Sequence, residues 1–317
     1  MDEIELKDIS FKYKGDQKKV FENLNLSFNK GNFSFVIGSN GSGKSTLLKL
    51  LLNANSPNKG FINYFGKTNP SKKHLASLIG YVPQDQSLDN EMWVEDLLDF
   101  KASFHLLHGN SLKKNKKTII EALGIDEILN KRIKQLSGGQ RQMINIALGL
   151  IHNPDVILLD EPFVGLDYHK SNQILAALNS LGKTIICITH DIDIAEKHAN
   201  QVIVLKDGVV IENQHPKELV RNNKFILQEI DFNTSVNDVI NELSDEVNCV
   251  NQYNKLIISY PDNSENAISV NHFIEKNNPN IIGVNTYKNS LKSTIVGLHN
   301  ISLLNEVRHK KKKKKKK

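Results

Sequence analysis

A glycine-rich loop between an apolar stretch and a helix-like stretch constrains this chain more than any other feature. Residues 38–46 read Gly-Ser-Asn-Gly-Ser-Gly-Lys-Ser-Thr, which fits the phosphate-loop pattern. The loop follows the apolar run 33–37 and precedes a helical run that reaches Leu52. Glycines let backbone N–H groups converge on phosphate oxygens, and the helix N-terminus adds its positive dipole end. Lys44 is placed to neutralise β- and γ-phosphates, and the Ser45 hydroxyl is placed to bind Mg²⁺. The loop therefore predicts a phosphate site in an α/β fold.

The apolar runs indicate what kind of sheet carries this loop. Residues 33–37, 156–159 and 184–189 are apolar or β-branched almost throughout. Strands of this kind are covered on both faces, which indicates a parallel sheet flanked by helices. Residues 1–36 mostly alternate apolar and polar side chains with turn residues between them, which predicts an antiparallel β subdomain at the N-terminus.

Two helices and a hairpin are predicted between and after these strands. A helix from about Met92 to His108 has apolar side chains at the spacing of one helical face: Leu97, Phe100, Phe104 and Leu107. A second helix, over 138–152, ends before Asn153-Pro154, because the residue before a proline disfavours the α region. Residues 202–211 form a hairpin around Asp207-Gly208.

The remainder of the chain predicts a smaller α+β domain. Residues 215–245 are polar and helix-like, 256–260 and 281–284 resemble strands, and helices are expected around 264–276 and 290–299. We therefore divide the chain into a first domain over 1–225, an accessory domain over 226–303 and a basic tail over 304–317.

Charge and composition exclude several classes of protein. The formal net charge is +6, but the last ten residues hold nine Lys or Arg and no acid, so the rest of the chain carries a small acidic excess. Non-specific nucleic-acid binding draws on a basic surplus, which the body of this chain does not carry. The chain has neither an apolar stretch of bilayer length nor a signal-like start, and its two cysteines are too few for a disulfide framework. We expect a cytoplasmic protein with reduced thiols.

Two further motifs bear on the chemistry of the phosphate site. Asp160 ends the run 156–159 and Glu161 follows it, so Asp160 is placed to hold Mg²⁺ and Glu161 to polarise a water molecule. Ser137-Gly138-Gly139-Gln140 opens the helix over 138–152, with Ser137 as a natural N-cap. This gives a second helix start at which bare N–H groups face an anion, although one nucleotide seldom needs two such loops from one chain. Capping alone also explains the serine-glycine motif.

Together these motifs resemble the nucleotide-binding subunit of an ABC transporter, the ABC ATPase family. The resemblance covers about residues 3–225 and rests, besides the phosphate loop, on motifs in the family's order: Tyr81-Val82-Pro83-Gln84, Leu136–Gln140, Asp160-Glu161, Gly165-Leu166-Asp167 and Ile188-Thr189-His190-Asp191. It implies a P-loop NTPase core with a helical signature subdomain, which binds ATP and Mg²⁺ and hydrolyses the ATP.

The resemblance also implies roles for single residues. Tyr13 should stack on adenine, Gln84 should sense Mg²⁺ and the reacting water, Glu161 should act as catalytic base, and His190 should contact the γ-phosphate. The phosphates should lie on Gly38, Ser39, Asn40, Gly41, Ser42, Gly43, Lys44, Ser45 and Thr46, with Ser45, Gln84 and Asp160 around the metal. Tyr13 also fits a strand aromatic, Gln84 a loop glutamine and His190 a histidine at the sheet edge.

The family's dimer accounts for the second anion-binding loop. By resemblance, Ser137, Gly138, Gly139 and Gln140 cap the γ-phosphate bound by an opposite subunit. Two subunits, identical or homologous, then sandwich two ATP molecules about a two-fold axis. Binding closes the dimer, and hydrolysis reopens it.

Two residues depart from the family pattern. Phe163-Val164 stands where Thr and a variable residue usually follow Asp-Glu-Pro, and the position of Phe163 has no explanation in the sequence. Trp93 replaces a usual Thr, in the region where the family docks its membrane partner. Both partner contact and ordinary core packing suit an amphipathic aromatic residue.

A separate membrane permease is the partner that the resemblance implies, and the protein would lie at the inner face of the membrane through it. Residues 289–298 resemble the ending of ATPase subunits that power drug, antibiotic or polysaccharide exporters, with Lys292, Ser293, Thr294 and Ile295 as departures. The alternatives are an energy-coupling ATPase for vitamin or metal-ion import, and a soluble ABC ATPase acting on nucleic acid or ribosomes. The lysine tail also fits contact with phosphate backbones, contact with anionic lipid, or a solvated coil.

Overall fold

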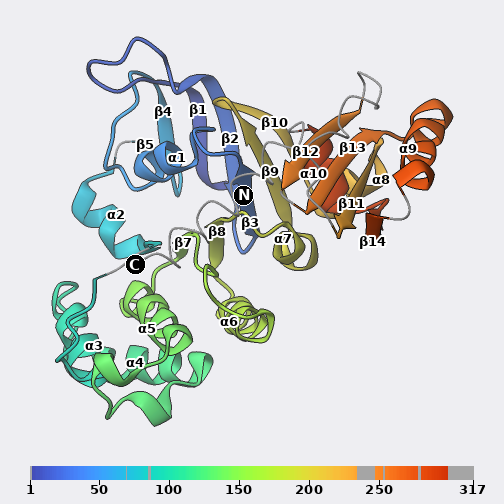
Figure 1. Cartoon of the computed structure of the whole chain (residues 1–317). Helices are drawn as coiled ribbons and strands as arrows, with labels where there is room; N and C mark the ends of the chain where they lie inside the picture. Colours follow the sequence, from blue (N-terminus) through green and yellow to red (C-terminus); the bar gives the residue numbers. More distant parts are fainter. Residues whose placement is uncertain are drawn as a thin grey trace.

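A parallel sheet forms the centre of the protein (Figure 1). The computed structural model describes residues 2–68, 70–84, 87–233, 247–252, 254–277 and 280–298. The strands of the central sheet lie in the order β10-β9-β3-β8-β7-β6. Their bounds are β3 Phe33–Gly38, β6 Ile79–Val82, β7 Val156–Asp160, β8 Thr184–Ile188, β9 Gln201–Lys206 and β10 Val209–Gln214. Every neighbouring pair is parallel except β9 and β10, which form the predicted hairpin. The α/β fold predicted from the apolar runs is confirmed.

One face of the central sheet packs on the phosphate-loop helix and the N-terminal sheet. This layer contains α1 (Lys44–Leu51), β1 (Asp2–Phe11), β2 (Phe21–Asn29), β4 (Lys59–Tyr64), β5 (Lys67–Thr68) and α2 (Lys72–Leu78). The second sheet has the order β2-β1-β4-β5 and is antiparallel, as the alternation in residues 1–36 predicts. Val156 and Leu158 of β7 point into this layer.

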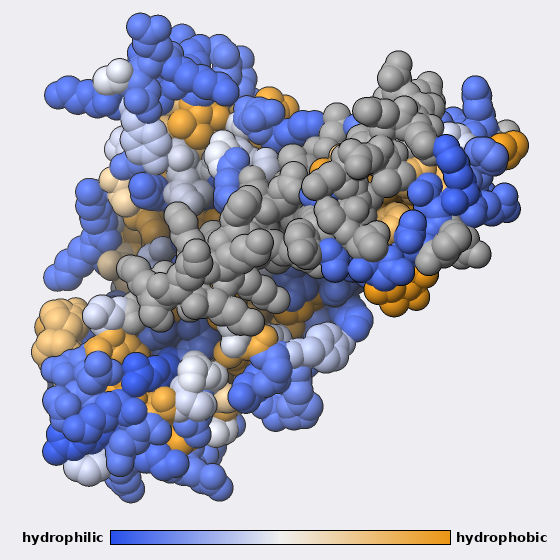
Figure 2. Space-filling view, viewed as in Figure 1, coloured by the Kyte–Doolittle hydropathy of each residue, from blue (hydrophilic) through white to orange (hydrophobic). Residues whose placement is uncertain are grey.

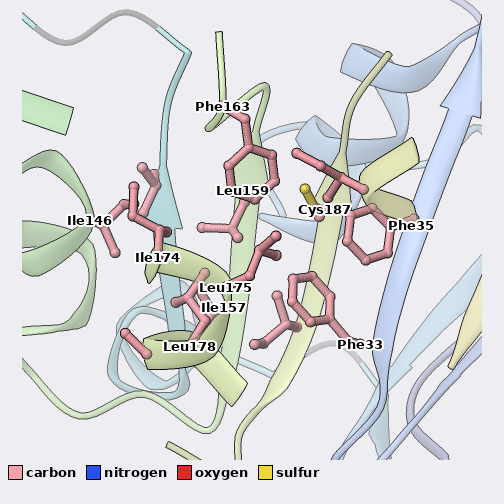
Figure 3. Packing of buried hydrophobic residues seen from close by; sticks show 14 of the residues in the cluster. Phe33, Phe35, Ile146, Ile157, Leu159, Phe163, Ile174, Leu175, Leu178 and Cys187 are labelled. Atoms are coloured by element: carbon pink, nitrogen blue, oxygen red, sulfur yellow. The ribbon is translucent and has the colours of Figure 1, made fainter. Parts of the chain in front are cut away.

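Helices cover the other face of the central sheet. They are α3 (Val94–Ser103), α4 (Gly109–Leu123), α5 (Gly138–Leu150), α6 (Tyr168–Ser180) and α7 (Ile192–His198), with short 3₁₀ turns at Asp126–Ile128 and Ile133–Gln135. Ile157 and Leu159 of β7 point to this side because successive strand residues alternate. Phe163 is 6% exposed and belongs to the same core, where Figure 3 shows its ring beside Leu159. Phe163 is therefore a core residue.

The helix predicted over 92–108 is shorter than expected and faces a different way. α3 covers only Val94–Ser103 and buries Val94, Leu97, Leu98 and Ala102. Phe100 and Phe104 are 54% and 67% exposed, so their predicted place on the buried face was wrong. Trp93 precedes α3 and is 42% exposed, with the Arg132 guanidinium 5.0 Å from its ring centroid, so it is not a core residue.

The C-terminal unit, residues 225–298, is a four-stranded antiparallel sheet between two helices. Its elements are β11 (Phe225–Phe232), β12 (Asn248–Gln252), β13 (Lys255–Pro261), α9 (Ser264–Asn277), β14 (Ile281–Tyr287) and α10 (Leu291–Leu298), and α8 (Pro216–Arg221) precedes it. The strand order is β12-β13-β11-β14. The predicted helix-like stretch over 215–245 is wrong over 225–232, which forms β11. Residues 234–246 and the lysine tail lie outside the described residues.

Candidate functional site

The phosphate loop connects β3 to α1 at the carboxyl edge of the central sheet. Lys44 is 7% exposed, and its ammonium group donates to the carbonyl oxygens of Gly38 at 2.5 Å and Ser39 at 2.8 Å. The Ser42 hydroxyl is buried, and no hydrogen-bond partner for its oxygen lies among the described residues. A buried cation and an unpaired hydroxyl in one glycine-rich turn suit a polyanionic phosphate chain.

Close contacts with neighbouring residues leave no room for a side chain at two glycines of this loop. Gly43 has φ +109°, and an added Cβ would lie 2.9 Å from the Phe21 ring. A Cβ on Gly38 would lie 2.2 Å from the Leu205 carbonyl oxygen and 2.6 Å from Ser42 Oγ. Only glycine fits both positions, so the two glycines that define the motif also hold the loop against β2 and β9.

Tyr13 lies beside the first turn of α1. Its hydroxyl is 3.1 Å from Thr46 Oγ1, and the Lys49 ammonium lies 5.6 Å from its ring centroid. The ring also meets Phe11 edge-on, with centroids 5.0 Å apart. The structure thus brings Tyr13 next to the phosphate loop, although its sequence position also suited a strand aromatic.

Asp160 lies at the end of β7, in the strand next to β6. The Tyr81 hydroxyl donates a hydrogen bond to the Asp160 carboxylate, and burial together with this negative charge raises the pKa of Tyr81. Gln84 lies two residues beyond the end of β6 and is half-buried. Tyr81 belongs to the motif at 81–84, but the sequence alone assigns it no role, and the structure adds it to the site. Because β6 pairs with β7, the residues at the end of β6 lie next to Asp160.

Glu161 and His190 contact each other directly. Glu161 Oε1 lies 2.9 Å from His190 Nε2, and the glutamate is only 6% exposed. Glu161 also has φ +50°, a left-handed conformation that is costly for a residue with a side chain. Its backbone N–H donates to the Ile188 carbonyl oxygen at 2.8 Å, which ties the strained residue to β8. The structure therefore brings together the ends of β7 and β8, which pair in the central sheet.

His190 is held by the residues on either side of it. Asp191 caps α7 by accepting a hydrogen bond from the Ile194 N–H at 3.0 Å, and its own N–H donates to Thr189 Oγ1 at 3.0 Å. His190 Nδ1 is buried, and no partner for it lies among the described residues. Buried polar atoms usually have a hydrogen-bond partner, so a bound ligand could form a hydrogen bond with this ring nitrogen.

The carboxylates at this edge of the sheet affect the buried thiol of Cys187. Burial first, and then the charges of Glu161 and Asp160, raise the pKa of the Cys187 thiol well above its ordinary value. Cys187 therefore remains a protonated core residue, which Figure 3 labels on the strand beside that of Leu159.

The serine-glycine motif lies at the start of α5, on the sheet face opposite α1. Ser137 and Gln140 form a capping box: the Gln140 N–H donates to Ser137 Oγ at 3.3 Å, and the Ser137 N–H donates to Gln140 Oε1 at 3.0 Å. Gly138 has open space where a Cβ would lie, whereas a Cβ on Gly139 would lie 2.9 Å from the Lys170 side chain. Capping explains Ser137 and Gln140, but it does not require the open surface at Gly138.

A second surface lies beside α3. Figure 2 shows hydrophobic atoms at the left edge of the visible face, over α3. In and just after α3, Phe100, Phe104 and Leu106 are exposed, and the two phenylalanine rings meet with centroids 5.0 Å apart. A nearby hollow of about 240 Å³ has apolar and basic lining residues, among them Lys72, Leu75, Tyr81, Lys101, His105 and His152. None of the described residues that line it is acidic.

A strand, phosphate loop and helix beside a carboxylate at the end of a neighbouring parallel strand define a P-loop nucleotide-hydrolysing protein. The profile of the ABC transporter family matches residues 21–164. The ergothioneine transport ATP-binding protein EgtV of Helicobacter pylori is 34% identical over 208 residues, which cover 64% of this chain and 97% of that protein. The chain belongs to the ABC transporter family and is an ATP-binding cassette of it, an ATPase.

Other relatives are exporters or much longer proteins. The Nod factor export ATP-binding protein I of Ralstonia nicotianae is 32% identical over 64% of this chain and 65% of its own length. ABC transporter G family member 23 of Dictyostelium discoideum is 35% identical over 68% of this chain, but the chain spans only 31% of that protein.

Solved structures agree with the fold. CbiO1 of Clostridium perfringens, described as part of the transporter complex cbiONQ, has a TM-score of 0.65 and 31% identity over 70% of this chain and 91% of its own. The cassette MJ0796, a dimer bound to ADP and Pi in a post-hydrolysis state, has a TM-score of 0.58 and 29% identity over 67% and 98%. Within the described part of this chain, no helix has the length and apolar character needed to cross a bilayer.

Proposed function

We propose that this chain binds ATP with Mg²⁺ between two ATPase subunits, hydrolyses it, and thereby drives a separate membrane permease that exports drugs, antibiotics or similar compounds. The observation that carries the proposal is the pair Glu161–His190, which lies at the carboxyl edge of the sheet that also presents the phosphate loop. A carboxylate and an imidazole at this edge are suited to activate water against a bound γ-phosphate.

The residues of the loop fit the phosphate chain of ATP. Lys44 donates to the backbone carbonyl oxygens of Gly38 and Ser39, and we infer that its ammonium moves to the β- and γ-phosphates when ATP binds. Backbone N–H groups of the loop then face phosphate oxygens, and the Ser42 hydroxyl, for which no partner lies among the described residues, gains one. Tyr13 lies beside α1, and we infer that its hydroxyl gives up the hydrogen bond to Thr46 so that the ring stacks on the base.

The three residues assigned to the metal present oxygen groups that fit a hard cation. Ser45 presents an exposed hydroxyl at the start of α1, and Asp160 presents a carboxylate from β7, with Gln84 following the adjacent strand. Oxygen donors of this kind suit Mg²⁺. When bound, Mg²⁺ supplies charge neutralisation at the β- and γ-phosphates. The Tyr81 hydroxyl orients the Asp160 carboxylate by its hydrogen bond.

Glu161 and His190 then divide the hydrolytic work. Oε1 of Glu161 is bonded to His190, so the second carboxylate oxygen is left to accept a proton from the attacking water. His190 presents a second ring nitrogen, and we infer that a turn of the ring brings an N–H to the γ-phosphate. The strained backbone of Glu161 holds its carboxylate in place before the substrate arrives.

A second subunit completes the site. The Ser137–Gln140 helix start lies on the sheet face opposite α1, which supports contact with a nucleotide held by another copy or a homologue. The dimeric MJ0796 cassette supports the same arrangement. Residues 137–140 then bind the γ-phosphate through bare N–H groups at the tip of α5.

The permease docks on the surface beside α3. The exposed rings of Phe100 and Phe104 provide apolar area, and the basic side chains of Lys72 and Lys101 suit a segment that carries acidic residues. Tyr81 lines the same hollow and bonds to Asp160, so docking and the nucleotide site share one strand.

Export is supported by the C-terminal segment 289–298 and by the Nod factor export relative. The alternative, an energy-coupling ATPase for import, is supported by the similarity to CbiO1. Purification of the chain with its membrane partner decides between them. A hydrophobic partner of about six spans supports export, whereas a small substrate-binding membrane protein with a second ATPase supports import.

The catalytic assignment has its own test. Glu161→Gln is expected to bind ATP with near-normal affinity, to lose turnover by about a thousandfold or more, and to trap a closed dimer, because the amide cannot accept the proton. Glu95→Gln, a change at an exposed side chain of α3, is the matched control and should turn over normally. Near-normal turnover by Glu161→Gln would refute the assignment.

A further inference from the structure

The C-terminal unit contacts the helix that follows His190. α10 packs against β11 and β13 on one side and against α7 and α8 on the other (Figure 1). Leu291, Ile295 and Val296 of α10 are fully buried and belong to the same core as Ile192 and Ala195 of α7. None of the nucleotide motifs accounts for this contact.

One polar contact joins the two helices directly. Glu196 of α7 is half-buried, and its Oε2 accepts a hydrogen bond from the backbone N–H of Leu291 at 3.1 Å. The N–H groups of a first helical turn have no partner within the helix, so a carboxylate there is favourable for both charge and hydrogen bonding.

α10 is held firmly to the rest of its own unit. Lys292 donates to Glu229 of β11 at 2.8 Å, so α10 moves with the C-terminal sheet. At the other end of the helix, Lys206 of β9 donates to the Leu298 carbonyl oxygen at 3.2 Å. Among the described residues, α10 therefore has one hydrogen bond to α7 and another to β9, and of these two the first is made to the segment that carries His190.

α7 is too short to absorb a displacement. It has seven residues, about two turns, and Asp191 at its N-cap directly follows His190. A shift of α7 therefore moves His190 relative to Glu161. The distance that would change is that between His190 Nε2 and Glu161 Oε1, which is 2.9 Å.

We propose that Glu196 is a positioning residue for ATP hydrolysis: by binding the N-terminus of α10 it anchors α7, and the C-terminal unit thereby holds His190 at the reacting phosphate. The proposal rests on the role of His190 proposed above. It gives the C-terminal unit an influence on the rate of hydrolysis without contact between that unit and the nucleotide.

The test compares four variants of the full chain by steady-state ATPase kinetics and thermal melting. Glu196→Ala removes the acceptor, Glu196→Gln keeps an acceptor oxygen, Lys206→Ala removes the tie to β9 alone, and His190→Ala removes the imidazole. Glu196→Ala is expected to lower kcat roughly tenfold, the scale of one lost hydrogen bond to a charged group, with KM for ATP unchanged. Glu196→Gln should restore kcat, and Lys206→Ala should turn over normally.

Combination with His190→Ala separates the possible failures. If Glu196 acts through His190, Glu196→Ala has no further effect on kcat in the His190→Ala background. Normal kcat in Glu196→Ala, equal losses in Glu196→Ala and Lys206→Ala, no rescue by glutamine, or a full additional loss in the double variant would each overturn the inference. Normal turnover in His190→Ala would instead overturn the proposed role of His190.

Discussion

Gly208, at the turn between β9 and β10, provides a sharp test of how the phosphate loop is supported. Its N–H donates to the Ser42 carbonyl oxygen at 3.0 Å. It has φ +81°, and an added Cβ would lie 1.9 Å from the Val20 carbonyl oxygen. Replacement by alanine therefore forces the turn away from the segment that precedes β2, and the support under Ser42 moves with it.

The expected cost has two parts. An L-residue in the left-handed region costs about 1–2 kcal/mol. The overlap with a backbone oxygen adds about 1–3 kcal/mol, the usual range for overpacking. Gly208→Ala should thus lower the free energy of unfolding by about 2–5 kcal/mol. Gly182→Ala is the matched control, because Gly182 also has positive φ, +62°, but nothing lies within 4 Å of an added Cβ. It should cost about 1–2 kcal/mol.

Urea denaturation measures stability, and titration with a fluorescent ATP analogue measures affinity. Gly208→Ala should also weaken nucleotide binding by about 1.5 kcal/mol, roughly tenfold in Kd, because the backbone at Ser42 shifts. Gly182→Ala should bind normally. Equal stability losses in the two variants, or unchanged affinity in Gly208→Ala, would show that this turn does not support the loop as described.

Three other predictions follow from the core and the surface. Burial lowers the pKa of His152 to about 4, so the folded state binds fewer protons than the unfolded state between about pH 6.5 and 4. The free energy of unfolding should fall by up to about 3 kcal/mol as pH falls through this window, and the fall should flatten in His152→Gln; an unchanged slope would contradict it. Phe163→Ala should cost about 3–5 kcal/mol in a denaturant melt, and a loss under 1 kcal/mol would place Phe163 outside the core. Phe100→Ser with Phe104→Ser should weaken permease binding in a pull-down and leave the ATPase rate of the isolated chain unchanged; unaltered binding would move the docking site elsewhere.

The parts of the fold that the sequence predicts well are those with one strong local signal. The apolar runs of β3, β7 and β8 indicate burial on both faces, and Asp207-Gly208 fixes the β9–β10 hairpin through two positive φ values. The parallel sheet also places Asp160 and His190 at the carboxyl ends of strands in one sheet, but the adjacency of β7 and β8 comes from the structure.

The errors arise where helical spacing is ambiguous. The spacing of Phe100 and Phe104 is compatible with the buried face of a helix. In the structure Leu98 and Ala102 lie on the buried face instead, so the two phenylalanine rings are exposed to solvent. β11 follows the polar residues 222–224, and its apolar side chains pack against α9 and α10, which come later in the chain. The Glu161–His190 contact and the Tyr81–Asp160 bond depend on the lateral order of strands, which is a tertiary property that local periodicity does not contain.

Enclosure of ATP between the phosphate loop of one copy and the α5 tip of another can be measured by light scattering on Glu161→Gln, with and without saturating ATP and Mg²⁺. We expect the mass to double with nucleotide, alone or after addition of a homologous partner subunit. The doubling should be lost when Gly138→Asp places a carboxylate at the tip. A particle that stays monomeric under both conditions while ATP is bound would show that two copies do not enclose the nucleotide.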